Sequence, residues 1–390
     1  MNIELAQRLQ QIPPYEFATI GKRIRELQVQ GHKVIGLHMG SPDMPPPPAV
    51  VEALHRSAQQ PTHHGYGGFS GTPALRQAFA GYYSRRFGVE LNPDTEVLPL
   101  IGSKEGIFNA SLAFLNEGDV ALVPDPAYPT YEIGAMTAGA QAFHMPLREE
   151  LGFLPDLDSI PSDVLKHARL MWINYPNNPT GAQATLAELA KIVDFCRDHS
   201  IVLCSDNPYA DVVMEGDPAP SVLSVPGAKD VAVEFNSLSK TYNMAGWRVG
   251  ACVGHPTFVA GLGRLKSNID SGLFRSIQDA AVVAMTETSQ EWIDQRNAVY
   301  RRRRDAIMQA LPAVGLTAQT PRTAIYVWAK VPGGDDRAFA AAALEEAHVS
   351  LAPGSMYGEM GKGFVRFSLV LDEADIAEGM ERLAAWQARS

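Results

Sequence analysis

The order of short apolar runs is the feature of this sequence that most restricts its possible folds. Each run holds five or six residues and leads into a polar or glycine-containing turn, and helical patterns such as residues 102–115 and 186–199 lie between the runs. Runs of this length are typical of strands that are buried on both faces, as in parallel sheets. Strands that alternate with helices favour an α/β fold, in which helices cover both sides of a mostly parallel sheet. The runs are residues 96–101, 119–123, 170–174, 201–205, 231–235 and 249–253.

A change of pattern after residue 290 predicts a second, smaller α/β domain. At 390 residues the chain is long for one core, so two domains are expected. Residues 1–35 read as a polar helical arm that Pro13–Pro14 interrupts early. We predict an arm over residues 1–45 that packs on the small domain or on a partner subunit, a large domain over 46–288 and a small domain over 289–390. The small domain is expected to hold a helix over 292–311, a strand over 324–330, a helix over 337–347, strands over 349–352 and 364–369, and a helix over 373–389.

Composition and charge narrow the compartment and the partners. The net charge of -10 opposes binding to nucleic acid, and we interpret the one basic run, Arg301–Arg304, as a solvated helix face. Cys196, Cys204 and Cys252 each lie in an apolar run, which predicts buried free thiols in a reducing compartment. The first residues lack a signal-peptide pattern, and no apolar run is long enough to span a bilayer. We expect a cytoplasmic protein with no nucleic-acid or membrane partner.

The segment from Ser237 to Gly250 carries the strongest chemical signal. It reads S-L-S-K-T-Y-N-M-A-G-W-R-V-G and places Lys240 between two apolar runs, residues 231–235 and 249–253. A lysine among apolar residues loses its proton more easily, and a neutral amine can form a Schiff base with a carbonyl. Ser237 and Arg248 are residue types that hold a phosphate. The segment therefore suits a phosphorylated carbonyl cofactor, although a lone lysine in a surface loop would leave a similar pattern.

This segment resembles the pyridoxal-phosphate (PLP) lysine motif of class I/II aminotransferases, the fold-type-I group related to aspartate aminotransferase. Five further features follow the family's order: G-S-K at 102–104, the loop with Tyr128, N-P-T-G at 178–181, D-N-P-Y at 206–209, and Arg366 within a strand. G-S-K resembles the branch that contains LL-diaminopimelate, N-succinyldiaminopimelate and some alanine aminotransferases. The resemblance runs from about residue 34 to the end. It implies a mostly parallel seven-stranded sheet in the large domain, with a smaller α/β domain beside it.

The resemblance also implies how PLP is held. Lys240 would bond the cofactor's carbonyl carbon and later act as the general base. Asp206, a carboxylate at the tip of an apolar strand that needs a cation, would pair with the protonated pyridine nitrogen. Residues at the start of a helix offer free N–H groups to a phosphate, and Ser103 could also cap that helix. The cofactor-binding residues would be Gly102, Ser103, Lys104, Tyr128, Asn178, Asp206, Tyr209, Ser237, Lys240 and Arg248, with Tyr66 from the partner subunit.

A buried arginine is the main candidate for substrate binding. Arg366 lies among apolar neighbours, where a guanidinium needs a bidentate carboxylate. In the family it clamps the α-carboxylate of the substrate, with Gly40 and Asn178 close by. Tyr131 and residues 264–278 are weaker candidates, the latter bordering the partner's active site. His63 and His64 are adjacent and have no third ligand spaced nearby, so no metal site is predicted.

The predicted function is transfer of an amino group between an L-amino acid and a 2-oxo acid by ping-pong kinetics. 2-Oxoglutarate and glutamate would form one pair, and the donor would be diaminopimelate-type or alanine-type, in a homodimer with shared active sites. The same scaffold can carry a carbon–sulfur β-lyase or a cyclopropane-forming synthase, and these alternatives stay open. A non-catalytic effector-binding module is a further alternative, but its relatives carry an added DNA-binding domain, and the acidic charge argues against one here.

Overall fold

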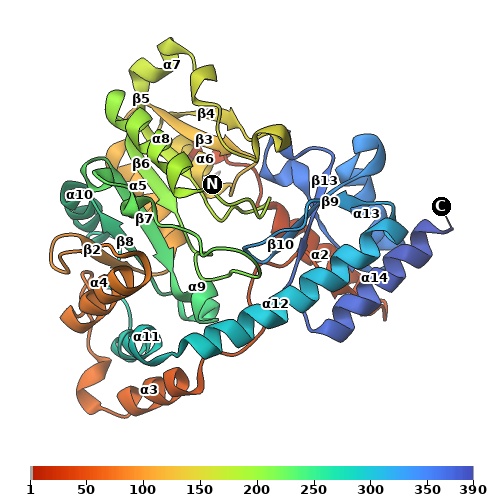
Figure 1. Cartoon of the computed structure of the whole chain (residues 1–390), viewed down its shortest axis with the longest axis horizontal. Helices are drawn as coiled ribbons and strands as arrows, with labels where there is room; N and C mark the ends of the chain where they lie inside the picture. The colour runs from red at the N-terminus through yellow and green to blue at the C-terminus, as the bar shows by residue number, and fades with distance from the viewer. Residues whose placement is uncertain (1–2, 390) are drawn as a thin grey trace.

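A twisted seven-stranded sheet forms the centre of the larger part of the molecule (Figure 1). The computed structural model describes residues 3–389, so Met1, Asn2 and Ser390, the ends of the predicted arm and small domain, lie outside the described residues. Only β8 runs antiparallel to its neighbours, β2 and β7, which confirms the mostly parallel sheet. In spatial order the strands are β2 (Val97–Leu100), β8 (Gly250–Gly254), β7 (Ala232–Ser237), β6 (Val202–Asp206), β5 (Ala168–Ile173), β3 (Val120–Asp125) and β4 (Gln141–Pro146).

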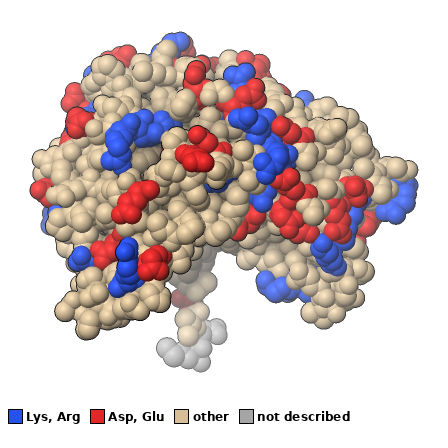
Figure 2. All heavy atoms as spheres, turned by 60° about the horizontal axis from the view of Figure 1, so that its bottom comes forward, with Lys and Arg blue, Asp and Glu red and all other residues tan. Residues whose placement is uncertain are grey.

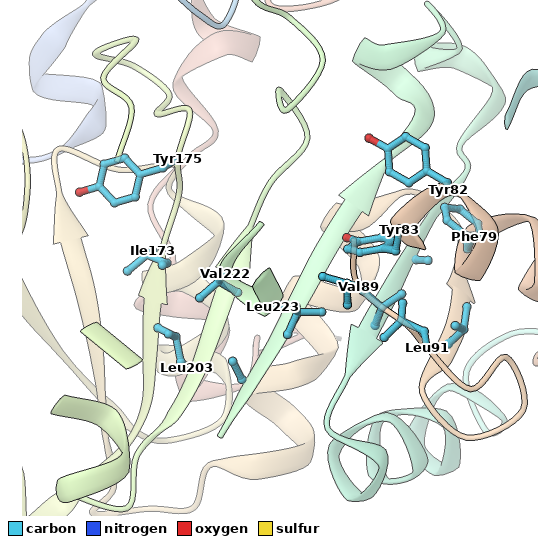
Figure 3. Close-up of a cluster of buried hydrophobic side chains, with 14 of the residues drawn as sticks. Phe79, Tyr82, Tyr83, Val89, Leu91, Ile173, Tyr175, Leu203, Val222 and Leu223 are labelled. Atoms are coloured by element: carbon cyan, nitrogen blue, oxygen red, sulfur yellow. The ribbon is translucent and has the colours of Figure 1, made fainter. Parts of the chain in front are cut away.

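Helices cover both faces of this sheet because its central strands are apolar on both sides. In β5, Leu170 and Trp172 point into one core, whereas Met171 and Ile173 point into the other. Figure 3 shows part of the second core, where Ile173 and the aromatic rings of α4 lie over the same face. The first core holds α5 (Ser103–Phe114), α6 (Thr130–Thr137) and α10 (Pro256–Lys266), and the second holds α3 (Pro48–Ala58), α4 (Pro73–Phe87), α8 (Leu186–Asp198) and α11 (Arg275–Glu287).

The C-terminal part has its own four-stranded antiparallel sheet and its own core. The predicted strand over 349–352 is in fact two short strands, because Val349–Ser350 pairs with Ile35–Gly36 whereas Ala352–Pro353 pairs with β13. The boundaries predicted at 46 and 289 stay predictions. The elements are β1 (Ile35–Gly36), β9 (Thr317–Ala318), β10 (Tyr326–Lys330), β11 (Val349–Ser350), β12 (Ala352–Pro353), β13 (Phe364–Ser368), α12 (Gln290–Ala310), α13 (Asp336–Glu346) and α14 (Glu373–Gln387).

The N-terminal arm lies against the C-terminal part of the same chain. It contains α1 (Gln7–Gln10) and α2 (Glu16–Val29). Arg23 of α2 forms an ion pair with Glu345 of α13 at 2.6 Å, and Glu16 pairs with Arg337 at 2.9 Å. These contacts fix the start of α2, and with it Tyr15 and Phe17, beside the cavity described below.

The basic run on α12 differs from the sequence-based interpretation. Arg301 and Arg302 are exposed, but Arg303 and Arg304 are buried, so a solvated helix face is wrong for these two residues. Arg303 binds both carboxylate oxygens of Asp43, at 2.8 and 2.7 Å, and Arg304 donates to the Pro321 carbonyl at 3.0 Å. Burial is possible because these partners replace the water that the guanidinium groups lose.

The surface and the helices bear on the partner predictions. On the face in Figure 2, Lys and Arg side chains alternate with Asp and Glu and form no continuous basic surface. Across residues 3–389, none of the helices combines the length and the apolar character needed to cross a membrane. Within the same range, no three His, Cys, Asp or Glu side chains converge as metal ligands would. His63 instead lies 2.8 Å from the Ser57 hydroxyl.

Candidate active site

A cavity of about 740 Å³ lies where the parallel strands β5, β6 and β7 end. Ligands of open α/β sheets bind at this edge. Asn174, Asp206 and Ser237, each at a strand end, line the cavity together with residues of the arm and of the C-terminal part. The predicted site residues that line it are Gly40, Ser103, Lys104, Tyr128, Asn178, Asp206, Tyr209, Ser237, Lys240, Arg248 and Arg366. Gly102 lies directly beside Arg248, whereas Tyr66 is 93% exposed and does not line this cavity.

Lys240 lies on the single-turn helix α9 (Leu238–Thr241), which follows β7 directly. Its Nζ donates a hydrogen bond to the Gly40 carbonyl and faces the cavity. Burial lowers the pKa of Lys240 to about 7, and the positive charges of Arg366 and Arg248 contribute to that lowering. A large fraction of this amine is therefore neutral near pH 7, as a nucleophile or a general base requires.

Asp206 has one free oxygen that faces no protein donor. Its Oδ2 accepts a hydrogen bond of 2.7 Å from the Tyr131 hydroxyl, but its Oδ1 is buried and has no partner among residues 3–389. Burial raises the pKa of Asp206 to about 7, the Tyr131 hydrogen bond lowers it, and the charge of Glu234 raises it. A buried carboxylate in this state needs a cation, and a protonated pyridine nitrogen provides one.

Asp206 and Lys240 together predict how stability depends on pH when no cofactor is bound. The pKa of Asp206 is raised to about 7, so its contribution to the free energy of unfolding is lost as the pH rises from about 4 to about 7. The pKa of Lys240 is lowered to about 7, so its contribution is lost as the pH falls from about 10 to about 7. Each slope is at most about 1.4 kcal/mol per pH unit. For these two groups, denaturant titrations should find the lowest stability near pH 7.

Two variants separate the slopes. Asp206→Asn removes the titrating acid and should flatten the slope between about pH 4 and pH 7 relative to the unchanged protein. Lys240→Met should flatten the slope above about pH 7. An acidic slope that is the same with and without the Asp206 carboxylate would show that its pKa is not raised by burial.

The start of α5 forms an anion site with Arg248. Gly102 occupies the N-cap position with a φ of 74°, and no side chain caps the first N–H groups, so Ser103 is the first helical residue and not the expected cap. A Cβ atom at position 102 would lie 2.1 Å from Nη2 of Arg248, so only glycine allows this approach. Arg248 itself has a φ of 58°, in the left-handed region that few non-glycine residues adopt.

Two serines complete this end of the cavity, and Lys104 also lines the cavity. The Ser237 hydroxyl donates to the Ser239 hydroxyl at 2.9 Å, and both face the cavity. Hydroxyls, free helix N–H groups and a guanidinium are the donors that a phosphate requires. The ammonium of Lys104 lies 5.2 Å from the ring of Tyr15 and 5.5 Å from that of Tyr128, so it points along the cavity wall that these rings form.

Arg366 projects from β13 into the same cavity. Its two terminal nitrogens donate to Asn178 Oδ1 and to the His38 carbonyl, each at 2.7 Å. Its guanidinium lies 4.0 Å from the ring centre of Tyr326, whose hydroxyl contacts the Tyr209 hydroxyl at 2.9 Å. A cation held by neutral partners only keeps its charge available for a substrate carboxylate.

The sequence did not reveal several residues that position the site. Asn174 donates to the Asp206 carbonyl at 2.7 Å and accepts from the Asn178 N–H at 2.8 Å, so it ties two predicted residues together. Its place at the end of an apolar run was the available signal. Tyr131 lies behind Asp206, stacked at 5.0 Å on Trp172, and not in the substrate pocket. Tyr326 gave no signal, because it reads as one more apolar strand residue.

The cavity fits the cofactor that the sequence motifs imply. Asp206, whose Oδ1 has no partner among residues 3–389, lines one cavity together with Lys240 and with Arg248, which lies beside Gly102. A ring nitrogen, a carbonyl carbon and a phosphate match these three features in turn.

Comparisons with known proteins agree with this geometry. The family described as aminotransferase class I and II matches residues 32–383. The chain is 46% identical to the LL-diaminopimelate aminotransferase of Dehalococcoides mccartyi over the full length of both chains, and 46% identical to that of Aquifex aeolicus over 97% of this chain and 98% of the other. Substrate-bound BacF of Bacillus subtilis aligns with a TM-score of 0.94 at 37% identity, covering 99% of this chain and 98% of the other. A probable N-succinyldiaminopimelate aminotransferase of Thermus thermophilus aligns with a TM-score of 0.90 at 38% identity, covering 95% and 99%.

Proposed function

This chain belongs to the class I and II aminotransferases, with the PLP dependence and fold type I of that family, and we propose that its amino donor is LL-diaminopimelate or a closely similar amino acid, with 2-oxoglutarate as the acceptor. The observation that carries the donor proposal is a second set of cations in the cavity of Arg366. Lys104 and Arg25 line that cavity, and neither has an ion-pair partner within residues 3–389. LL-diaminopimelate carries an α-amino-acid group at each end, so one carboxylate can meet Arg366 and the other these two cations.

The residues of the cavity divide the chemical work. PLP, when bound, supplies an electrophilic carbonyl carbon and a ring that withdraws electrons. Lys240 Nζ would hold that carbon in the resting enzyme and, as a neutral amine, would take the proton from the substrate α-carbon. Asp206 Oδ1 would keep the ring nitrogen protonated, and Arg366 with Asn178 and the Gly40 backbone would orient the α-carboxylate.

The remaining predicted residues hold the cofactor in place. Asn178 and Tyr209, which line the cavity, would donate to its phenolic oxygen, and Tyr128 would hold its ring. The N–H groups at the start of α5, with Gly102, Ser103 and Lys104, bind the phosphate together with Ser237 and Arg248. In this arrangement the Lys104 side chain stays free for the distal carboxylate, since it points at the rings of Tyr15 and Tyr128.

An absorbance titration tests the function and ranks the donors. Purified protein reconstituted with PLP should lose its visible absorbance with LL-diaminopimelate and regain it with 2-oxoglutarate, with release of glutamate. L-Alanine, which lacks the distal carboxylate, should react with a much lower kcat/KM. Ammonia and pyruvate as products would instead identify a β-lyase, and a protein that PLP leaves colourless would contradict an enzyme. A higher kcat/KM with alanine would overturn the donor proposal.

We also propose that two copies of the chain share their active sites. Tyr66 is 93% exposed, and the exposed Ile269 and Phe274 lie on the neighbouring loop. The two loops touch, because a Cβ atom on Gly272 would lie 2.0 Å from the Gly68 carbonyl. An exposed apolar patch of this kind favours a second copy, with Tyr66 reaching the partner's cofactor phosphate. The domain boundaries remain predictions. A cytoplasmic location, which the three buried free cysteines suggest, is a further prediction.

Mixing two defective variants tests the shared site. Tyr66→Ala should bind PLP about 10- to 100-fold more weakly, since a hydrogen bond to a charged group is lost. Lys240→Ala should be inactive. A hybrid dimer of the two has one intact site, so an equal mixture assayed at limiting PLP should regain about a quarter of the normal activity. Mixtures that regain none, or a protein that sediments only as a monomer, would contradict the proposal.

A further inference from the structure

One face of α12 carries buried arginines that the chemistry described so far does not use. Arg296 and Arg303 are seven residues apart, so they lie on the same side of the helix, with the buried Tyr300 between them. They are only 3% and 4% exposed. Figure 1 shows α12 running from beside α9 and α11 in the larger part to β10 and α14 in the C-terminal part. The helix therefore lies beside elements of both parts of the molecule, each of which contributes residues to the cavity.

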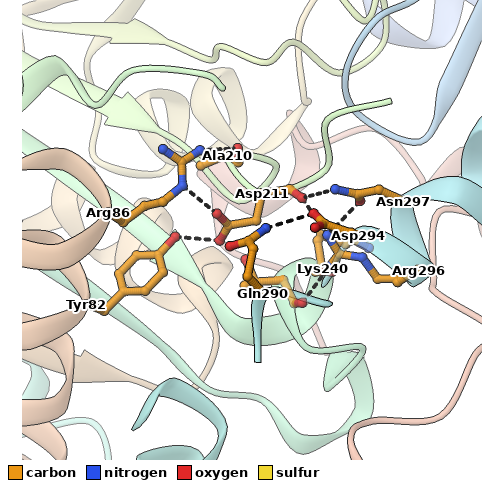
Figure 4. A network of polar contacts seen from close by, with 10 residues as sticks. Tyr82, Arg86, Ala210, Asp211, Lys240, Gln290, Asp294, Arg296 and Asn297 are labelled. Carbon is orange, nitrogen blue, oxygen red and sulfur yellow. Dashed lines mark hydrogen bonds and ion pairs between the residues drawn. The ribbon is translucent and has the colours of Figure 1, made fainter. Parts of the chain in front are cut away.

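Arg296 binds the backbone from which Lys240 projects. Its Nη1 donates to the Lys240 carbonyl at 2.8 Å and to the Thr241 carbonyl. Its Nη2 donates to the Asp211 carbonyl and, at 2.8 Å, to Asn297 Oδ1 (Figure 4). Each acceptor is a neutral oxygen, so none of them offsets the charge of Arg296. Burial disfavours that charge and lowers the pKa of Arg296.

The nearest carboxylate is engaged elsewhere. The Oδ atoms of Asp211 accept hydrogen bonds from the Tyr82 hydroxyl at 2.6 Å and from Arg86 Nε at 2.7 Å (Figure 4). Arg296 is thus a buried cation held mainly by main-chain oxygens, an expensive arrangement for stability alone. Because burying this charge costs free energy, we expect Arg296 to have a role in placing those carbonyls.

The length of α9 explains why its carbonyls need a donor. With only four residues, α9 cannot satisfy its last carbonyls by its own hydrogen bonds. A cation at the end of a helix donates to these groups and matches the helix dipole. Because the carbonyl held at 2.8 Å belongs to Lys240 itself, Arg296 fixes the point from which the Lys240 side chain extends.

Arg303 holds the two segments that carry Gly40 and Arg366, which lie near the Lys240 amine. It binds the Asp43 carboxylate at 2.8 and 2.7 Å and donates to the Leu369 carbonyl at 2.9 Å. Asp43 lies three residues after Gly40, whose carbonyl accepts from Lys240 Nζ. Leu369 follows β13, the strand that carries Arg366.

We propose that Arg296 is a positioning residue for Lys240, and that α12, through Arg296 and Arg303, sets the distance of the Lys240 amine from Gly40 and Arg366. Arg296 does not line the cavity and reaches Lys240 through the backbone of α9. The inference rests on the role of Lys240 in the proposed function, but not on the identity of the amino donor.

Three variants on the same helix test the proposal. In Arg296→Met the α9 carbonyls lose their donor, so kcat per reconstituted site should fall about 10- to 100-fold, as a misplaced catalytic group causes, with KM within about 3-fold. Arg296→Lys keeps the charge and some of the hydrogen bonds and should recover part of kcat. Arg302→Met is the matched control, because the Arg302 side chain is 57% exposed and, within residues 3–389, forms an ion pair only with Glu373. It should behave as the unchanged protein.

A second measurement works without cofactor or turnover. Apoprotein is treated with formaldehyde and borohydride across the pH range, and methylation of Lys240 is followed by peptide mass spectrometry. In the unchanged protein the midpoint should lie near the lowered pKa of Lys240, about 7. In Arg296→Met a loosened α9 lets the amine reach water, so the midpoint should rise by about one pH unit. This measurement stays valid even if the donor proposal fails.

The outcomes separate positioning from simple stabilisation. A folded Arg296→Met variant with a lower Tm, but with kcat within about 2-fold and an unchanged methylation midpoint, would overturn the proposal. If Arg296→Met does not fold, Arg296→Lys decides, since a stabilising role alone predicts unchanged kcat and midpoint in any folded variant. Reduced kcat together with a raised midpoint would support positioning.

Discussion

Replacing Lys240 with alanine is expected to lower kcat for transamination by at least about 10⁴-fold, because one side chain supplies both the covalent bond and the general base. Its Nζ donates to the Gly40 carbonyl, and its pKa is lowered to about 7 by burial and by Arg366 and Arg248. No other described lysine lines the cavity except Lys104, whose ammonium lies beside the Tyr15 and Tyr128 rings. Single-turnover kinetics with saturating PLP measure the loss directly.

A matched lysine controls for loss of charge in the same cavity. Lys104→Ala should leave single-turnover proton transfer nearly unchanged with an amino acid that lacks a distal carboxylate, whereas Lys240→Ala should abolish it for every donor. Added methylamine should restore a small part of the lost rate only in Lys240→Ala, since the space of the lysine amine is then open. A Lys240→Ala protein that keeps its full biological function would instead indicate a non-catalytic effector-binding module.

The central sheet could be predicted because its inner strands carry their own signal. Residues 170–174 and 201–205 are apolar on both faces and occupy the middle of the sheet as β5 and β6. The edge strand β4 (Gln141–Pro146) was missed, since five of its six residues are at least partly exposed and it reads as a polar segment. Burial on two faces, which only inner strands have, is what makes a strand visible in a sequence.

Short strands of the C-terminal part depend on partners far away in the chain. Ile35–Gly36 is a strand only because Val349–Ser350 lies beside it, more than 300 residues later. Neither segment has enough residues to show a period of two. Local patterns could therefore place the helices of this part, such as α13 and α14, but not the pairing of its two-residue strands.

The sequence motifs predicted most residues of the site, but not the residues that support them. Asp206, Lys240 and Arg366 each carry a signal, since a charge in an apolar run needs an explanation. Tyr131, Asn174 and the buried arginines of α12 have roles that come only from tertiary contacts. Arg303 illustrates the difficulty. Within a run of four arginines, only the helix orientation separates the two exposed side chains from the two buried ones.

Replacing Arg366 with methionine is expected to lower kcat/KM for the amino donor by about 30- to 4,000-fold, which is the usual cost of removing one partner from a buried charge pair. Its guanidinium has no carboxylate partner among residues 3–389 and is held by Asn178 Oδ1 and the His38 carbonyl, each at 2.7 Å. A substrate carboxylate would be its first anionic partner. Because that contact exists in the ground state and in the transition state alike, most of the loss should be in KM.

A donor without a carboxylate separates binding from structure. Arg366→Met should change the slow reaction of a simple primary amine by less than about 3-fold, since no carboxylate is present to lose a contact. Arg366→Lys should recover only part of the loss with the amino acid, because one ammonium cannot hold Asn178 and the His38 carbonyl while it binds a carboxylate in two places. An equal loss for the amine and the amino acid would mean that Arg366 supports Asn178 and β13, and that the carboxylate binds elsewhere. The distal cations Lys104 and Arg25 would then be the first alternative to test.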